Sequence, residues 1–311
     1  MALTILEASK IALGRDKALD ATVMELFAKN SDLLLNLPVE NISGNALSYD
    51  REKVLPTIEF RGVNEAYTEG TGEVEKITET LAICGGDIDV DKYIVQTGGM
   101  DQRAVQESLK IKALSLKITK NCIKGSIATD MKSFDGLQVR LTGSQLISAG
   151  STASGNALSL TKLEEVIDNV DEPTHLLMNK QMRRRLSAAS RSASVGGYIT
   201  YTQDAFGRKV TNYNDLPILI AFRDETNTEI MAFDELAAQG IGAVCSSIYC
   251  LSFADNGVVG LQNADITATN LGEIDTKPVF RTRIEWYFTI SCKRPYSAAR
   301  LYGITDAAAA A

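Results

Sequence analysis

The sequence predicts an α+β protein whose extended and helical parts occupy separate stretches of the chain. Residues 54–97 carry β-branched and aromatic residues in partial alternation around glycines, and residues 100–124 have the spacing of a long amphipathic helix. Residues 198–292 consist mostly of strand-like segments. A chain of 311 residues with 45% hydrophobic content is long enough to bury a sizeable core.

Residues 1–53 are expected to form an N-terminal arm with helical pieces. Asp16 precedes apolar residues that would share one helix face, namely Leu19, Val23, Met24, Leu26 and Phe27. Pro38 and Gly44 continue a helix poorly, so we expect the chain to leave this arm in an extended form.

Residues 54–97 predict a long two-stranded ribbon. The segments VLPTIEFRGV, ITETLAI and DIDVDKYIV have strand-like composition, and turns or bulges are expected at Gly70, Gly72, Gly85 and Gly86. A limb of about twelve residues would reach about 40 Å at roughly 3.3 Å per residue. Because an isolated two-stranded ribbon is at best marginally stable, we expect this one to need a packing partner.

The strongest helix prediction covers residues 100–124. Gly98 and Gly99 precede it, and Gly125 is predicted to cap its end in a left-handed conformation. The apolar residues form two neighbouring rows, Val105, Leu109, Ala113 and Leu116 in one and Ile111, Leu114, Ile118 and Cys122 in the other.

The second half of the chain alternates helix and strand before it becomes mostly strand. Residues 133–159 are rich in Gly and Ser and predict strand fragments and loops. LTKLEEVIDNVDEP and NKQMRRRLSAAS are predicted helices on either side of a short buried strand, THLLMN. The longest strand predicted is VFRTRIEWYFTISC.

Charge and composition argue against several classes of protein. The 32 Lys and Arg against 39 Asp and Glu give a net charge of -7, which disfavours a DNA-binding protein with a basic face. No apolar run predicts a membrane span, and the first residues lack a secretory signal pattern, so we expect the protein to stay where it is made. Five scattered cysteines without a C-x-x-C pair fit reduced thiols better than disulfides or zinc.

No set of residues predicts a catalytic centre, a metal or a cofactor. The single histidine, His175, precedes the apolar run LLM and is expected to be a core or interface residue. The glycine patterns at 70–75 and 240–245 lack the third glycine of a dinucleotide fingerprint. We expect no enzyme, although an α+β enzyme that uses only carboxylates, such as Glu164, Glu165 or Asp168, stays open as an alternative.

Three charged clusters each allow two interpretations. Asp87, Asp89 and Asp91 begin like a calcium loop but lack its later ligands, so a solvated acidic face is favoured over a weak ion or subunit contact. The lysines of the long helix form either a solvated face or one that meets acidic partners: Lys110, Lys117, Lys120 and Lys124. A basic cluster is either an exposed helix face or an anion contact: Arg183, Arg184, Arg185 and Arg191.

The order of these parts resembles that of the major capsid proteins of tailed bacteriophages with the Hong Kong 97-type fold. LPTIEFRGVNEAYTEGTGEVEKI resembles the extended E-loop of that family, and MDQRAVQESLKIKALSLKITKNCIKG resembles its spine helix. SFDGLQVRL is similar to the passage after that helix, and SSIYCLSFADNGVVGLQ and RIEWYFTISCKRPYSAARLYGI resemble the closing strands. The resemblance spans essentially the whole chain and lies in the order and spacing of the parts.

The resemblance implies a domain plan. It places an N-terminal arm at 1–53, the E-loop ribbon at 54–97 and a tail at 307–311. The peripheral domain would take 98–165 and 250–290, with the spine helix at 100–124, and the axial domain would take 166–249 and 291–306.

The resemblance also implies a structural protein of the virion. Such a protein self-assembles into the hexamers and pentamers of an icosahedral head around double-stranded DNA, in the host bacterial cytoplasm. Its partners would be portal, scaffolding and decoration proteins, with no membrane and no cofactor. The alternative with the same fold is an encapsulin-type nanocompartment shell, which would enclose a cargo enzyme.

In such a shell the ribbon would lie across a neighbouring subunit, which supplies the missing packing layer. The candidate contact residues are Ile58, Phe60, Arg61, Glu69, Glu73, Val74, Glu75, Lys76 and Ile77. The arginine cluster at residues 183–191 would lie in the axial domain, near the capsomer axis. Some family members crosslink a ribbon lysine to a neighbour's asparagine, for which Lys76 with Asn263 or Asn270 would be the candidates here. The surrounding motif does not match, so we do not expect a crosslink.

Overall fold

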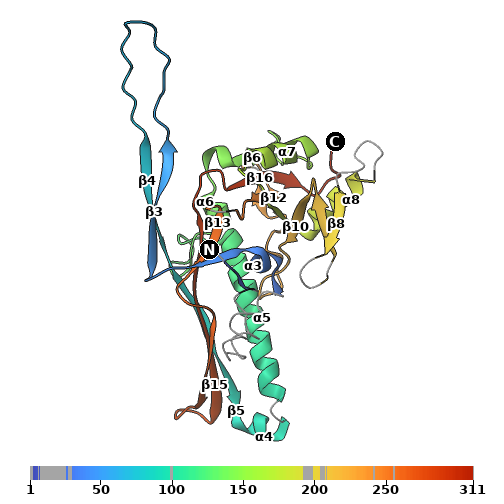
Figure 1. Cartoon of the computed structure of the whole chain (residues 1–311). Helices are drawn as coiled ribbons and strands as arrows, with labels where there is room; N and C mark the ends of the chain where they lie inside the picture. The colour runs from blue at the N-terminus through green and yellow to red at the C-terminus, as the bar shows by residue number, and fades with distance from the viewer. Residues whose placement is uncertain are drawn as a thin grey trace.

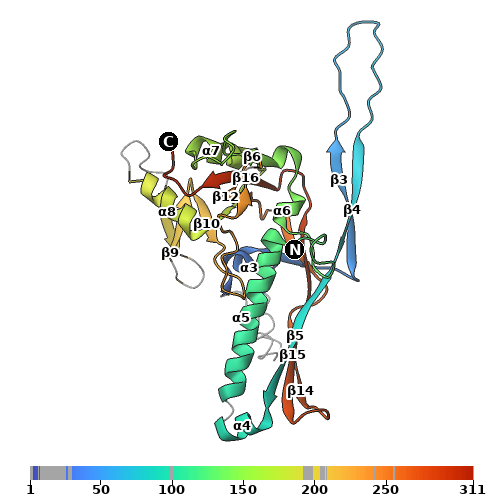
Figure 2. The same cartoon turned by 180° about the vertical axis from the view of Figure 1, so that it is seen from behind.

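The computed structural model describes residues 3–5, 7, 26, 30–98, 101–191, 199–203, 207, 209–240, 242–254 and 256–310. The described strands form a six-stranded sheet, an eight-stranded sheet and a two-stranded ribbon. Figures 1 and 2 show that the ribbon projects from one side of the molecule, while a long helix extends in the opposite direction. The helix predicted from residues 16–27 lies outside the described residues, except for Leu26.

The six-stranded sheet is organised around β15 (Val279–Cys292), the longest described strand, as VFRTRIEWYFTISC predicts. The sheet path runs through β1 (Leu3–Thr4), β2 (Pro38–Asn41), β13 (Val258–Gln262), β15 and β14 (Thr267–Glu273). In addition, β5 (Ala82–Asp91) pairs antiparallel with β15 along ten residues, from Ala82 opposite Phe288 to Asp91 opposite Val279. The chain that leaves the ribbon is therefore held by one of the last strands.

The long helix α5 (Asp101–Lys124) packs on this sheet and agrees with the helix predicted over residues 100–124. One predicted apolar row is buried in the core with Trp286 and Phe288, namely Ile111, Leu114, Ile118 and Cys122. The other row is not buried throughout, because Val105 and Leu109 are 50% and 55% exposed. An amphipathic pattern alone cannot show how far along a helix its partner extends.

Gly125 ends α5 for a different reason from the one predicted. It is absent from the glycines with positive φ, so the prediction of a left-handed cap is wrong. A Cβ at this position would lie 2.4 Å from the carbonyl oxygen of Asn121 and 2.5 Å from that of Phe134. The turn after the helix therefore needs glycine for space between backbone segments.

The eight-stranded sheet forms the second unit, to which the C-terminus also belongs. Its path is β6 (Leu146–Ser148), β16 (Ala298–Thr305), β12 (Ala243–Leu251), β7 (His175–Met178), β10 (Leu216–Ile220), β9 (Lys209–Tyr213) and β8 (Ile199–Gln203), and β11 (Glu235–Leu236) pairs with β12. The predicted helices are α7 (Leu160–Asp168) and α8 (Lys180–Ala189), with β7 between them as predicted.

Both of these helices cover the same face of the eight-stranded sheet. Leu163 and Val166 of α7 and Met182 and Leu186 of α8 belong to one buried core. That core takes alternate residues of β12, Ile248 and Cys250, whereas Tyr249 and Leu251 point into the core of the first sheet. The sheet is therefore shared between two hydrophobic layers.

The predicted domain plan assigned residues 146–165 to the peripheral domain, but these residues pack with the second unit. Strand β6 pairs in parallel with β16, and Leu160 and Leu163 lie in the core under the two helices. Only the pairing partner, which the sequence does not display, shows to which sheet a three-residue strand belongs. The assignment of the two units to peripheral and axial domains stays a prediction.

Four short helical segments connect these parts, namely α3 (Asp32–Asn36), α4 (Lys92–Gly98), α6 (Leu137–Arg140) and the 3-10 turn η1 (Gly143–Gln145). DIDVDKYIV was predicted as one strand, and its second half instead forms α4. The reason lies at Asp91, whose carboxylate accepts a hydrogen bond of 2.8 Å from the backbone N–H of Tyr93 and ends the strand.

Candidate functional site

The feature that distinguishes this chain is the ribbon, defined here as residues 46–80. Its strands β3 (Ala46–Val54) and β4 (Glu73–Thr80) pair only with each other, from Ala46 opposite Thr80 to Val54 opposite Glu73. Two ion pairs join the strands near the tip-side end of the ribbon. They are Arg51 with Glu75 at 3.2 Å and Lys53 with Glu73 at 3.1 Å. The first strand begins upstream of the predicted boundary at residue 54.

The ribbon continues into a tip, residues 55–72, that contains no strand although VLPTIEFRGV was predicted as one. Pro56 has no backbone N–H to give to a ladder, which disfavours pairing there. The two limbs of the tip nevertheless run close together, since a Cβ on Gly70 would lie 2.2 Å from Thr57 Oγ1. At the turn, Asn64 has a positive φ of 67° and the Glu65 carboxylate accepts the Gly62 N–H at 2.7 Å.

The tip exposes an unusual number of large apolar side chains. Ile58, Phe60 and Val63 are at least 91% exposed. Leu55 and Tyr67 are also exposed, and the Arg61 guanidinium lies 5.1 Å from the centre of the Tyr67 ring. No described part of the chain covers these side chains, so the tip presents apolar surface that the isolated subunit leaves in water.

The nine residues predicted as contacts are all on the ribbon, but they have different surroundings. Ile58, Phe60, Arg61 and Glu69 lie on the exposed tip, whereas Ile77 is half-buried on β4. Glu73 and Glu75 already have intrachain cation partners, and Val74 and Lys76 are exposed between them. Sequence reasoning missed Leu55, Val63 and Tyr67, although their position in the same Gly-bounded segment was a usable signal.

The base of the ribbon is fixed to the body by buried polar groups. The Glu79 carboxylate accepts from both terminal nitrogens of Arg140, one at 2.8 Å, and the Arg140 Nε–H donates to the carbonyl of Asp135 at 2.6 Å. The Tyr49 hydroxyl is hydrogen-bonded with Ser291 at 3.2 Å, and burial raises the pKa of Tyr49. These contacts set the direction in which the tip projects.

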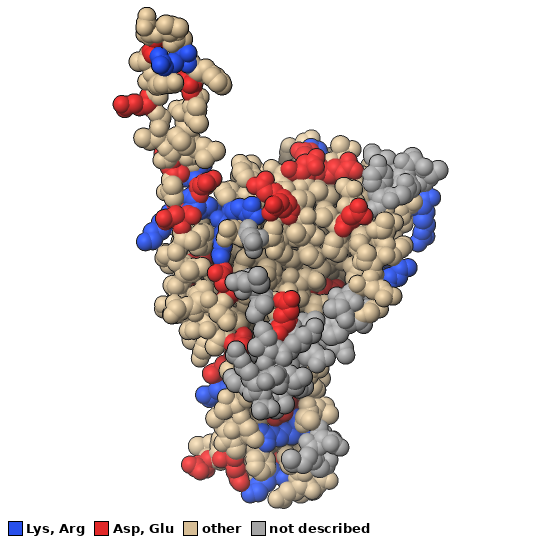
Figure 3. All heavy atoms as spheres, viewed as in Figure 1, with Lys and Arg blue, Asp and Glu red and all other residues tan. Residues whose placement is uncertain are grey.

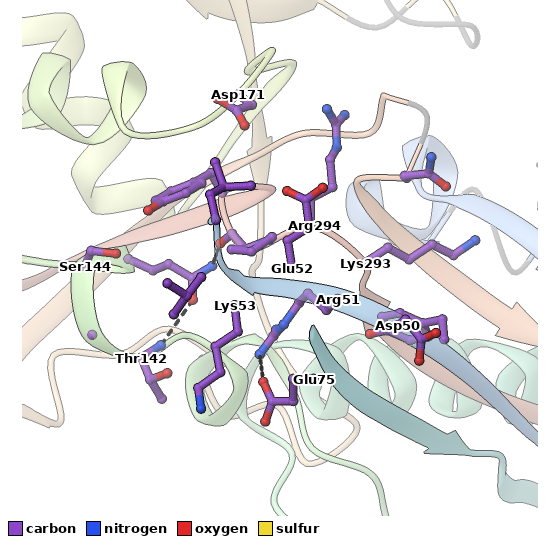
Figure 4. A pocket seen from close by; sticks show the side chains of 18 of the residues that line it. Asp50, Arg51, Glu52, Lys53, Glu75, Thr142, Ser144, Asp171, Lys293 and Arg294 are labelled. Carbon is purple, nitrogen blue, oxygen red and sulfur yellow. Dashed lines mark hydrogen bonds and ion pairs between the residues drawn. The ribbon is translucent and has the colours of Figure 1, made fainter. Parts of the chain in front are cut away.

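A groove of about 1040 Å³ lies between the base of the ribbon and the body (Figure 4). On the ribbon side it is lined by Arg51, Lys53 and Glu75, and on the body side by Ser144, Asp171, Lys293 and Arg294. Both cations and carboxylates line it, and its described lining contains no histidine or cysteine. Such a lining suits contact with a polypeptide better than acid–base chemistry.

Three arginines of the predicted cluster, Arg183, Arg184 and Arg185, lie on α8, and Arg191 lies in the turn just after it. The Asn179 side chain caps the helix by accepting the Met182 N–H at 2.7 Å, and Arg185 pairs with Asp306 at 2.9 Å. The four arginines, together with Lys209 and Tyr201, line a hollow of about 690 Å³. Sequence reasoning located the arginines and missed the two residues that distant strands add.

Three of the residues considered for catalysis, His175, Glu164 and Glu165, have structural contacts, whereas Asp168 is exposed at the end of α7. The ring of His175 packs on Phe253, 4.8 Å between ring centres, and burial lowers the pKa of His175 to about 4. Glu164 accepts from the Tyr213 hydroxyl at 3.3 Å, and Glu165 pairs with Lys162 at 2.5 Å. Within the described residues no group of three metal-binding side chains occurs.

Two charged faces predicted from sequence are paired within the chain. Asp87 and Asp89 on β5 each form two hydrogen bonds with an arginine of β15, Arg283 and Arg281, which lowers the pKa of both carboxyls. The acidic face is therefore not simply solvated.

The lysines of α5 meet acidic residues from the loop that follows β10. The pairs are Lys117 with Glu225 at 2.9 Å, Lys120 with Asp224 at 2.8 Å and Lys124 with Asp234 at 2.8 Å. The acidic partners of this face thus belong to the same chain.

Among the described helices, none is long and apolar enough to cross a membrane.

Comparisons with known proteins assign this architecture. Residues 15–160 match the family model described as Major capsid protein GP7. The cyanophage A-1(L) capsid asymmetric unit has a TM-score of 0.59 and 12% identity, with 86% of this chain and 90% of that chain covered. The chain has the Hong Kong 97-type capsid fold. The capsid of the native GTA particle is similar as well, with a TM-score of 0.57 and 14% identity, and 89% of this chain and 91% of that chain are covered.

The capsid fold also occurs in a shell that is not described as viral. The holo-SrpI encapsulin complex from Synechococcus elongatus PCC 7942 has a TM-score of 0.64 and 16% identity, with 90% of this chain and 89% of that chain covered. A comparison with curated proteins gave no match. The family match over residues 15–160 supports the role of a structural capsid protein, whereas the phage and GTA neighbours, at 12% and 14% identity, show the fold.

Proposed function

We propose that this chain is the major capsid protein of a tailed phage and that its ribbon joins neighbouring subunits of the head. The observation that carries the proposal is the tip, where Ile58, Phe60 and Val63 are almost completely exposed on a ribbon that pairs with no other described strand. A two-stranded ribbon needs a further packing layer. A second copy of the capsid subunit would supply that layer.

Many weak contacts between subunits would be enough to hold the shell together. Burial of one Phe or Ile side chain contributes roughly 1.5–3 kcal/mol, and each exposed ion pair contributes about 0–1 kcal/mol. A closed shell repeats every contact by symmetry, so modest contacts suffice for a stable particle. Hexamers and pentamers of an icosahedral head are the assembly that this fold supports.

The proposed partners follow from that assembly. The head would enclose double-stranded DNA and would be completed by portal, scaffolding and decoration proteins in the cytoplasm of a bacterial host. A net charge of -7 suits a wall that does not hold packaged DNA tightly, because phosphate binding requires an excess of Lys and Arg.

A second candidate is an encapsulin-type nanocompartment shell, favoured by the TM-score of 0.64 to the encapsulin complex. The two candidates share the subunit and differ in what the shell encloses. Analysis of nucleic acid and co-purified protein in particles isolated from the native source would distinguish a genome from a cargo enzyme.

The test uses particle mass and negative-stain images of the full chain expressed alone. The matched control is a tip-shortened variant in which a two-residue Asn-Gly turn joins Val54 to Glu73, which are opposite each other across the strands. We expect closed shells, rings or tubes from the natural chain and only small species from the variant. A natural chain that stays near the 33.6 kDa of one subunit under all conditions would contradict the proposal.

A further inference from the structure

The basic patch, defined here as Arg183, Arg184, Arg185, Arg191 and Lys209, gathers five cations around one hollow of the eight-stranded unit. Among the described residues, the one carboxylate that lines its hollow is Asp306, which pairs with Arg185. Within the described part of the chain, no carboxylate lies at ion-pair distance from Arg183, Arg184 or Arg191. A patch with this excess of cations fits an anionic partner.

The patch is held in shape by its surroundings. Met182 and Leu186 are buried in the core, which turns the arginines between them outward. The Lys209 ammonium lies 3.8 Å from the centre of the Tyr201 ring, so the strands β8 and β9 form the opposite wall of the hollow. The cations are thus presented by packed elements rather than by a free loop.

An acidic patch of matching character lies elsewhere on the same unit. It consists of Asp168, Asp171 and Glu172, at and just after the end of α7, and all three are exposed. Glu172 reaches Arg294 at 3.3 Å, and Asp171 also borders the groove at the base of the ribbon. Figure 3 shows acidic atoms along the upper surface, where Figure 1 places α7, and basic atoms at the edge near α8 and β8.

The two patches lie at opposite ends of strand β16. The Asp171 N–H donates to the carbonyl of Tyr296 at 2.9 Å, just before the strand begins. Arg185 pairs with Asp306, just after the strand ends. Ten residues of extended chain span roughly 30 Å at about 3.3 Å per residue, so the patches are too far apart to meet within one subunit.

We propose that the basic patch binds the acidic patch of a second copy, head to tail, and that this contact repeats around a ring of subunits. Two different, complementary patches at opposite ends of one unit form a heterologous interface, which closes into a ring when the rotation is right. This inference rests on the proposed capsid function, and it specifies the partner and the residues of one contact within each ring.

Nucleic acid is the other ligand that a basic patch could bind. The structure favours a second copy for two reasons. The chain carries a complementary acidic patch on the same unit, and a carboxylate that would repel a phosphate backbone, Asp306, lines the hollow of the basic patch. Complementary protein charges also steer association and set orientation, which a ring requires.

Charge reversal tests the contact. Variant A carries R184E and R191E, and variant B carries D168K and D171K. All four residues are exposed, and none forms an ion pair with another described residue. Each variant alone would place like charges across every contact. An equal mixture restores opposite charges at all contacts of an alternating six-membered ring and at four of the five contacts of a five-membered ring. The buried Trp286 provides a fluorescence check that both variants fold.

We expect each variant alone to lose about tenfold or more in the yield of assembled particles, and the mixture to recover most of it. The inference would be overturned if variant A assembled like the natural chain. If variant A formed normal particles that contained less DNA, the patch would instead be assigned to nucleic acid. Failure of the mixture to recover, with both variants folded, would also overturn it. A natural chain that never assembles would instead contradict the proposed capsid function.

Discussion

The ion pair between Glu79 and Arg140 offers a test of how the ribbon is held. The two side chains are only 9% and 15% exposed, and the carboxylate accepts from both terminal nitrogens of the guanidinium. Substitution of Glu79 by Ala leaves a buried guanidinium with one remaining hydrogen bond, to the Asp135 carbonyl. Removal of one partner of a buried pair costs about 3–5 kcal/mol, because the other charge stays out of water.

The matched control lies six residues away on the same strand. Glu73 pairs with Lys53 at 3.1 Å, but both side chains are at least 60% exposed, so Glu73→Ala should cost less than about 1 kcal/mol. A double variant, Glu79→Leu with Arg140→Leu, removes both buried charges and should recover most of the lost stability. The comparison separates the effect of an uncompensated charge from that of a smaller side chain.

The assay is urea unfolding at concentrations where the chain is monomeric, followed by the fluorescence of the single tryptophan. Trp286 is suitable because it is buried in the six-stranded sheet and donates to Gln262 at 2.8 Å. A loss of 3–5 kcal/mol lowers the urea midpoint by about 1 M or more for a chain of this size. Equal midpoints for Glu79→Ala and Glu73→Ala would refute the view that a buried ion pair anchors the ribbon.

Three further predictions concern the body. Burial lowers the pKa of His175 to about 4, below its unfolded value near 6.5, so the stability that the neutral ring contributes is present above pH 6.5 and is lost as the pH falls toward 4. His175→Gln should therefore show a smaller decrease in melting temperature between pH 7 and pH 5 than the natural chain. An equal decrease in both proteins would contradict this. Asp224 is 3% exposed and accepts hydrogen bonds from Lys120 and from two backbone N–H groups. Asp224→Asn should therefore lower the free energy of unfolding in urea by about 2 kcal/mol, and Glu225→Gln by less than half as much. Equal losses would contradict a special contribution of the buried Asp224 carboxylate. Gly125→Ala forces a Cβ against two carbonyl oxygens and should cost about 1–3 kcal/mol, and a stability equal to that of the natural chain would show that the turn has spare room.

The parts of the fold that the sequence predicts well are those fixed by local pattern. The helix α5 and the strand β15 match their predicted ranges, since a long run of 3.6-residue periodicity or of β-branched and aromatic residues has few competing interpretations. The helices α7 and α8 with the strand β7 between them follow for the same reason.

The ribbon shows where local pattern is insufficient. Its first strand, ALSYDREKV, is mostly polar, so only its pairing with β4 identifies it as a strand. The tip has β-branched and aromatic residues that suggest a strand, but Pro56 and the glycines prevent a ladder and those side chains point into water. An apolar residue placed for a neighbouring subunit gives the same signal as one placed for the core.

The charged groups show a similar limit. Four lysines on one face of α5 are visible in the sequence, but the acidic partners of three of them, Lys117, Lys120 and Lys124, lie about a hundred residues later. The separation of 104 residues between Lys120 and Asp224 is an example. Contacts between distant segments depend on the tertiary arrangement, which no local spacing encodes. The hollow of the basic patch is also formed by distant segments, because Tyr201 and Lys209 come from strands that the sequence does not place beside the arginines.

The most direct test of the account is a cryo-EM reconstruction of the assembled particle, in which the position of residues 55–72 is traced. The account predicts that the tip lies against a neighbouring subunit, with Ile58, Phe60 and Val63 covered there. A particle in which the tips project into solvent or fold back on their own subunit would contradict the claim that the ribbon joins neighbouring subunits.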